Sequence, residues 1–173
     1  MSNKIETFSD CYNELETNCD IYGGLYQWDE LMNYTTSSNS NPSGRQGICP
    51  VGWHIPSENE WCQMETFIDQ WVNCSNTGFT GVDAGERMKE AGTSHWATDP
   101  GVFANSSGFT ALPGGYFYQG IFNQLSIGTN LWSSTESTPT FAWNCHLRDF
   151  SPQVNRGDND KLHGESGRCL KDN

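Results

Sequence analysis

Hydrophobic positions recur at helical spacing in one stretch of the chain, residues 49–72. Successive apolar residues there lie three or four positions apart, as on the buried face of a helix. Ser57 and Glu60 have the spacing of a capping box, so the pattern predicts a helix over about 58–71. The apolar positions are Trp61, Met64, Ile68 and either Trp71 or Val72.

The rest of the first half is more polar. Residues 23–34 combine a short apolar run with a possible helical turn, and 35–47 have loop composition. Residues 1–20 are polar and contain two cysteines, which indicates a small disulfide-bonded loop. A shorter helix is expected near 84–90.

The second half has the pattern of an antiparallel sheet. From Gly92 onward, short apolar runs are separated by Gly, Ser, Asn and Pro. Residues 107–122 predict a loop that leads into a hairpin, while 131–135 and 141–147 predict adjacent strands. The order of elements predicts an α+β fold in a single domain over 1–173, with two helices packed on mostly antiparallel short strands and long loops.

One segment fits neither pattern. Residues 143–169 read WNCHLRDFSPQVNRGDNDKLHGESGRC, with neither steady alternation nor a helical period. Thiol, imidazole, guanidinium, carboxylate and phenyl groups follow one another without structural order. We therefore expect this segment to form the functional surface, held by the rest of the chain.

Charge excludes two classes of partner. Asp and Glu outnumber Lys and Arg by 21 to 9, which gives a net charge of −12. Nucleic acid and anionic membranes both require clustered basic residues.

No apolar run approaches the roughly 18 residues of a membrane span. The start MSNKIETFSD lacks the apolar core of a signal peptide, so we expect either a leader missing from this sequence or a virion protein.

Cysteine usage indicates an oxidising destination. The absence of a Cys-x-x-Cys pair makes zinc-ribbon and thioredoxin-like sites weak hypotheses, and the odd number leaves at least one thiol unpaired. The seven cysteines are Cys11, Cys19, Cys49, Cys62, Cys74, Cys145 and Cys169.

Four stretches carry a family resemblance: CPVGWHIPSENEW, NSSGFTALPGGYF, LWSSTE and GRCLKD. From about Gly23 to Asp172 the chain resembles the Fibrobacter succinogenes major paralogous domain, which implies a C-type lectin-like fold similar to that of formylglycine-generating enzymes. The strand-rich start of the family is largely missing, and GESGRC replaces a more apolar run. The resemblance implies a Cys49–Cys169 disulfide; Cys11–Cys19 and Cys62–Cys74 are weaker expectations.

The segment of about 141–168 also resembles the variable region of proteins that retroelements diversify by randomising adenines. Its framework positions are Ala142, Trp143, Asn144, Leu147, Val154, Asn155, Arg156, Asn159, Lys161, Gly164, Arg168 and Cys169. The resemblance implies that the residues between them are variable, ligand-binding positions: Cys145, His146, Arg148, Asp149, Phe150, Ser151, Pro152, Gly157, Asp158, Asp160 and His163. An asparagine codon randomised at its two adenines can yield each of these residue types, whereas Gln153 is not reachable.

The sequence gives less support to a metal site or an enzyme active site. Asp158, Asn159 and Asp160 carry hard oxygen ligands, but the EF-hand pattern fails at Leu162 and His163. The calcium-binding triplets of sugar-binding C-type lectins are missing. A structural calcium site elsewhere in the chain is an alternative that the sequence leaves open. Cys145 and His146 are a thiol and a base next to each other in the sequence, as a catalytic pair would require. Neighbouring side chains on a strand point to opposite faces, however, so these two are not expected to meet.

The other histidines, His54, His95 and His163, lack metal-ligand spacing, and His54 is predicted to be a structural residue. No cofactor is therefore expected.

The sequence thus predicts a non-enzymatic display domain that binds a protein or glycan receptor on a target surface, at a virion tail-fibre tip or a cell surface. A fixed-specificity adhesion or carbohydrate-binding module is the alternative, and a formylglycine-generating-type enzyme is a lesser one. We expect Arg148 and Phe150 to be binding anchors. Arg148, Phe150, Asp158 and Asp160 are predicted to be exposed, and Trp143, Leu147, Val154 and Trp132 to be buried.

Overall fold

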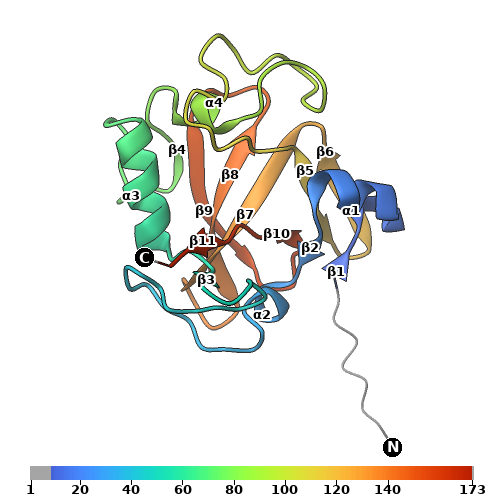
Figure 1. The fold of residues 1–173 in the computed structure, drawn as a ribbon, viewed down its shortest axis with the longest axis vertical. Coiled ribbons are helices and arrows are strands. Elements are labelled where there is room, and N and C mark those ends of the chain that lie inside the picture. Colours follow the sequence, from blue (N-terminus) through green and yellow to red (C-terminus); the bar gives the residue numbers. More distant parts are fainter. Residues whose placement is uncertain (1–8, 173) are drawn as a thin grey trace, which may run out of the picture.

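The computed structural model describes residues 9–172, which form a nine-stranded sheet and a separate two-stranded sheet, with the helices arranged around the larger one (Figure 1). The helical elements are η1 (Tyr12–Glu14), α1 (Glu16–Tyr22), α2 (Trp28–Leu31), α3 (Glu58–Ile68) and α4 (Ala84–Met88). The strands are β1 (Ser9–Asp10), β2 (Leu25–Tyr26), β3 (Trp53–His54), β4 (Gly78–Thr80), β5 (Gly114–Tyr118), β6 (Ile121–Leu125), β7 (Gly128–Glu136), β8 (Phe141–Arg148), β9 (Val154–Asp160), β10 (Glu165–Ser166) and β11 (Leu170–Lys171). The predicted α+β class is confirmed.

The centre of the sheet is built from β7, β8 and β9, which pair antiparallel in sequence order. The path through the sheet is β1-β2-β10-β7-β8-β9-β4, and β5 branches from β7 and pairs with β6. β3 and β11 form a separate antiparallel pair that brings the end of the chain beside the base of α3 (Figure 1). The predicted adjacency of 131–135 and 141–147, and the hairpin near 107–122, are confirmed.

Helix α3 begins as its capping box predicts. The Ser57 hydroxyl accepts a hydrogen bond from the Glu60 amide at 3.2 Å, and a Glu60 carboxylate oxygen accepts one from the Ser57 amide at 2.9 Å. The helix ends at Ile68, three residues earlier than predicted, because the backbone of Asp69 is extended and its buried carboxylate accepts the amide of Trp71 at 2.9 Å. The apolar pattern extended beyond the helix because the following turn also reaches the core.

Two clusters of buried side chains make up the core. The first joins α3 and α4 to one face of the central sheet and includes Trp61, Met88, Leu147 and Val154. The second lies around Trp132, which is fully buried with Trp28, Leu31, Ile55 and Ala142. The predicted burial of Trp132, Leu147 and Val154 is therefore confirmed.

All three predicted disulfides are present: Cys11–Cys19, Cys49–Cys169 and Cys62–Cys74. The Cys49–Cys169 bond joins residues 120 positions apart, so it closes most of the domain into one loop. In the chain-entropy model a loop of this length stabilises the folded state by about 4 kcal/mol. Disulfides of this kind are typical of extracellular proteins.

Two predictions about local structure were wrong. Part of the supposed loop over 1–20 contains η1 and α1, which no periodicity signalled because α1 buries none of its side chains. The supposedly irregular segment 143–169 contains most of β8 and all of β9. The Gly, Asp and Asn residues of β9 have low strand propensity, but pairing with β8 and β4 on both edges overrides it.

Candidate ligand-binding surface

The β8–β9 hairpin presents two different faces. Cys145 lies directly opposite Arg156, and His146 lies opposite Asn155. Since successive side chains on a strand alternate, Cys145 and Arg156 point toward α3, while His146 and Asn155 point away from it. We call the second side, with His146, Arg148, Asn155 and Gly157 and with Phe79 of β4, the distal face.

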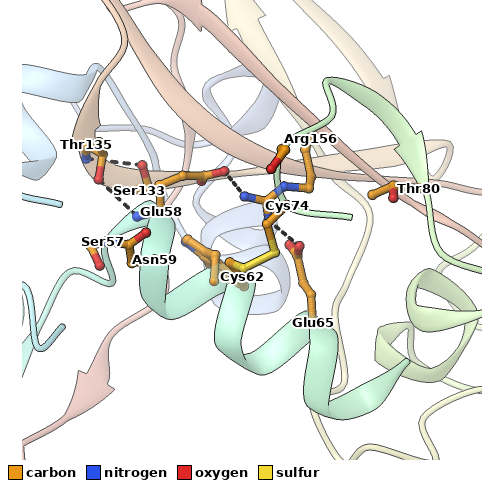
Figure 2. A network of polar contacts seen from close by, with 12 residues as sticks. Ser57, Glu58, Asn59, Cys62, Glu65, Cys74, Thr80, Ser133, Thr135 and Arg156 are labelled. Atoms are coloured by element: carbon orange, nitrogen blue, oxygen red, sulfur yellow. Dashed lines mark hydrogen bonds and ion pairs between the residues drawn. A yellow bond between two sulfur atoms is a disulfide. The ribbon is translucent and has the colours of Figure 1, made fainter. Parts of the chain in front are cut away.

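On the α3 side, a buried ionic network ties the sheet to the helix (Figure 2). The guanidinium of Arg156 is 2% exposed and forms ion pairs with Glu58 and Glu65. Burial raises the pKa of both carboxyls, that of Glu58 to about 8. Two carboxyls facing one guanidinium therefore retain a proton at neutral pH. Arg156 was predicted as a framework position, and this contact gives it a structural role.

Other framework residues are held in the same way. The carboxylate of Glu165 is fully buried and accepts hydrogen bonds from the amide groups of Asn130 at 3.0 Å, Asn144 at 2.8 Å and Asn159 at 2.5 Å. Lys161 pairs with Glu136 at 2.5 Å. These framework side chains, Asn144, Asn159 and Lys161, are thus bonded parts of the fold.

Residues 149–153 form the turn between β8 and β9, and its main chain is held from outside. The Asp149 amide donates to the Ile127 carbonyl at 2.8 Å, and the Pro152 carbonyl accepts the Glu86 amide at 2.8 Å. The carbonyl of Ser151 accepts a hydrogen bond from the Lys89 ammonium at 2.6 Å. These bonds use backbone atoms of the turn, so they do not depend on which side chains it carries.

Lys89 is fully buried beneath this turn. Burial lowers the pKa of its ammonium to about 8, although the charges of Asp149 and Glu86 oppose the shift. The ammonium also lies 5.3 Å from the ring centroid of Trp96. A buried lysine is unusual without a carboxylate partner, and here it supports the turn's backbone from inside.

The turn projects an aromatic side chain into solvent. Phe150 is 70% exposed, and its ring centroid lies 5.9 Å from that of Phe79, which is 41% exposed. The two rings meet edge to face, a favourable aromatic geometry. Phe79 was not among the predicted site residues, because no sequence pattern links the short strand β4 to the turn.

Half-buried groups cover much of the distal face. His146 is packed beside Arg148 and His163; burial and these charges lower its pKa to about 3, so its imidazole is neutral at pH 7. The ring of His163 lies 3.9 Å from that of Tyr118, centroid to centroid. The Arg148 guanidinium donates to the carbonyls of Thr129 at 3.2 Å and Leu147 at 3.0 Å.

The predicted variable positions therefore divide into three groups. Cys145 and Ser151 are buried, so their side chains offer little contact surface to a ligand. Six are half-buried: His146, Arg148, Asp149, Gly157, Asp160 and His163. Phe150, Pro152 and Asp158 are exposed.

Among the burial predictions, those for Phe150 and Asp158 are confirmed, while Arg148 and Asp160 are only half-exposed. Arg148 is drawn inward by the two carbonyls it binds, which weakens its predicted role as an anchor. Trp143 is half-buried instead of buried, because it lies near the start of β8, where Phe141 also reaches solvent.

The thiol of Cys145 and the imidazole of His54 are both buried in the fold. The Cys145 thiol is 1% exposed and faces Glu65, not His146, and its burial raises its pKa well above the ordinary value. His54 is buried between Glu60 at 2.9 Å and Asp172 at 2.5 Å, as expected of a structural histidine. Within residues 9–172, no cluster of His, Cys, Asp and Glu has the geometry of a metal site. No helix in that range is long and apolar enough to span a bilayer.

These features define a disulfide-bonded α+β domain whose sheet supports an exposed turn on a fixed framework. The chain belongs to the Fibrobacter succinogenes major domain family, whose model matches residues 2–171. Comparison with curated proteins and with solved structures gave no match.

Proposed function

We propose that this protein is a display domain with a C-type lectin-like fold, which binds a macromolecular receptor through the β8–β9 turn and the adjoining distal face. We further propose that these positions are diversified by a retroelement. One observation carries the proposal: framework side chains such as Arg156, Asn144 and Asn159 are bonded inside the fold, whereas the turn is held by its backbone.

This arrangement separates folding from recognition. Side chains at exposed positions such as Phe150, Pro152 and Asp158 can change at little cost in folding free energy. The main-chain bonds to Lys89, Glu86 and Ile127 would keep the same loop shape. A rigid loop loses less entropy on binding, so the affinity of each variant is better preserved.

The expected receptor is a protein or a glycan on a target surface, with Phe150 and Phe79 as the aromatic anchor. An aromatic anchor of this kind often contributes about 2 kcal/mol or more. Asp149, at the start of the turn, favours a receptor with basic groups. A virion tail-fibre tip or a cell surface is the expected location, in keeping with the disulfides.

The binding test uses the purified chain on a glycan array and on an array of bacterial outer-surface proteins. Phe150→Ser and Phe79→Ser should abolish any specific signal. Val102→Ser is the matched control, because Val102 is 93% exposed and lies outside this surface. Equal loss of binding in all three variants, or a signal unaffected by the first two, would contradict the proposal.

A further inference from the structure

A groove runs along the opposite side of the molecule, between α3 and the end of the chain. Three adjoining cavities of about 740, 540 and 240 Å³ share Met64 among their lining residues. We call them together the α3 groove, which is lined by Met64, Phe67, Phe109, Arg168, Leu170 and Lys171. Because α3 packs on the face opposite to the distal face, this groove is separate from the proposed receptor-binding surface.

The floor of the groove is unusually apolar for an exposed surface. Phe67 is 91% exposed and Leu170 is 43% exposed, and Met64 and Phe109 are only partly covered. Phe67 points outward from α3, away from the core residues Trp61 and Glu65. A contiguous apolar surface next to polar residues is typical of an interaction site.

The rim of the groove carries two exposed positive charges. Within residues 9–172, Arg168 and Lys171 are the two basic side chains that are exposed, and neither has a carboxylate within ion-pair distance. The guanidinium of Arg168 lies 4.6 Å over the Phe109 ring and donates to the Phe109 carbonyl at 2.8 Å. These two cations stand out in a chain of net charge −12.

The groove also offers an open strand edge. β11 pairs with β3, with Leu170 opposite His54 and Lys171 opposite Trp53, and the Asp172 amide donates to the Gly52 carbonyl at 2.9 Å. In an antiparallel pair, hydrogen-bonded and non-hydrogen-bonded positions alternate. The amide and carbonyl of Lys171 therefore point away from β3, toward an edge that pairs with no other described strand.

We propose that the α3 groove binds an extended peptide segment of a partner protein that contains both acidic and apolar side chains. The backbone of the peptide would pair with the outer edge of β11. Its apolar side chains would cover Phe67, Met64 and Leu170, and its carboxylates would pair with Arg168 and Lys171. Such a segment would attach the domain to its carrier while the distal face stays free.

The high net negative charge of the chain identifies the residues on which binding of an acidic peptide must depend. An acidic peptide is repelled by the molecule as a whole, so its binding must depend on Arg168 and Lys171. A glycan would gain little from methionine and leucine side chains, whereas apolar peptide side chains would bury this surface. These considerations favour a peptide over a sugar as the occupant.

The test titrates the ¹⁵N-labelled full chain with the synthetic peptide Asp-Phe-Asp-Leu-Asp-Phe-Asp, capped at both ends. The control peptide has Lys in place of every Asp. We expect amide shifts at residues 168–172 and along α3 with the acidic peptide, and a Kd measurable by calorimetry. We expect no binding of the lysine peptide.

Two pairs of variants isolate the charge and the apolar floor. Arg168→Gln with Lys171→Gln should weaken binding at least tenfold, whereas Thr93→Glu with Ser94→Glu should not, although both pairs change the net charge by the same amount. Phe67→Ser should also weaken binding at least tenfold, and the equally exposed Val102→Ser should not. Melting curves confirm beforehand that each variant is folded.

Several outcomes would overturn the proposal. These are the absence of binding by the acidic peptide at millimolar concentration, equal binding of both peptides, and amide shifts confined to the distal face. Sedimentation velocity that shows a dimer lost in Phe67→Ser would assign the groove to a second copy of the chain. Displacement of the peptide by an oligogalacturonate would assign it to an anionic glycan.

Discussion

Replacing Trp132 by alanine should destabilise the protein far more than replacing three exposed residues at predicted variable positions. Trp132 is fully buried, packs against Trp28 and Ile55, and donates its indole N–H to the Tyr26 carbonyl at 2.9 Å. Truncating a buried Trp to Ala leaves a cavity and costs about 3–5 kcal/mol. The abandoned Tyr26 carbonyl adds to that cost unless water reaches it.

The comparison variant combines Phe150→Ser, Pro152→Ser and Asp158→Ser. All three residues are exposed, so each change should cost about 0.5 kcal/mol or less, and the total should stay near 1.5 kcal/mol. The loss of the Phe150–Phe79 contact is included in this figure, because Phe150 is 70% exposed.

Differential scanning calorimetry without reductant measures both effects. For a domain of this size, 1 kcal/mol corresponds to about 2–4 °C in Tm. We therefore expect a fall of about 6–20 °C for Trp132→Ala, and of no more than about 6 °C for the triple variant. If the triple variant melts as far below the parent as Trp132→Ala, the separation between framework and surface is wrong.

Three further predictions concern buried titratable groups. Burial lowers the pKa of His54, but its hydrogen bonds to Asp172 and Glu60 raise it by more, so the net pKa lies above 6.5. The protonated imidazole therefore stabilises the folded state below pH 6.5, and this stabilisation is lost as the pH rises through the folded-state pKa. Urea unfolding at pH 5.5 and 8 should show a smaller loss in His54→Gln than in the parent, because the buried carboxyls with raised pKa contribute the rest in both proteins. The folded-state pKa of Lys89 is lowered to about 8, so its contribution to stability should increase from there toward pH 10.5, and this increase should be missing in Lys89→Met. Cys145 should resist iodoacetamide in the native protein and react as a single thiol in denaturant; rapid alkylation of the native protein would contradict its burial.

The parts of the fold that sequence predicts are those with local signals. The capping box of Ser57 and Glu60 marks the start of α3, and alternating apolar runs mark β7 and β8. The Cys49–Cys169 disulfide followed from the family resemblance, whereas Cys11–Cys19 was indicated by two cysteines close together in a short polar stretch. These features depend on nearby residues or on a shared family pattern, so one sequence contains enough information to place them.

The parts that sequence missed depend on contacts between distant residues. Strand β9 forms because β8 and β4 pair with it on both sides, which its own residues do not signal. Lys89 supports the turn from 62 positions away, and Phe79 meets Phe150 only in the folded sheet. Cys145 fitted the genetic code of a variable position, yet the alternation of β8 places it in the core.

The proposal that this surface is diversified is tested most directly by sequencing the DNA around the gene, together with the gene itself from many members of the source population. The account predicts an adenine-rich near-copy of the segment encoding residues 141–168 beside a reverse-transcriptase gene. It also predicts that substitutions concentrate at Phe150, Pro152, Gly157 and Asp158 and avoid Arg156. The absence of a near-copy, with substitutions spread evenly over framework and surface, would contradict the account and favour a binding domain of fixed specificity.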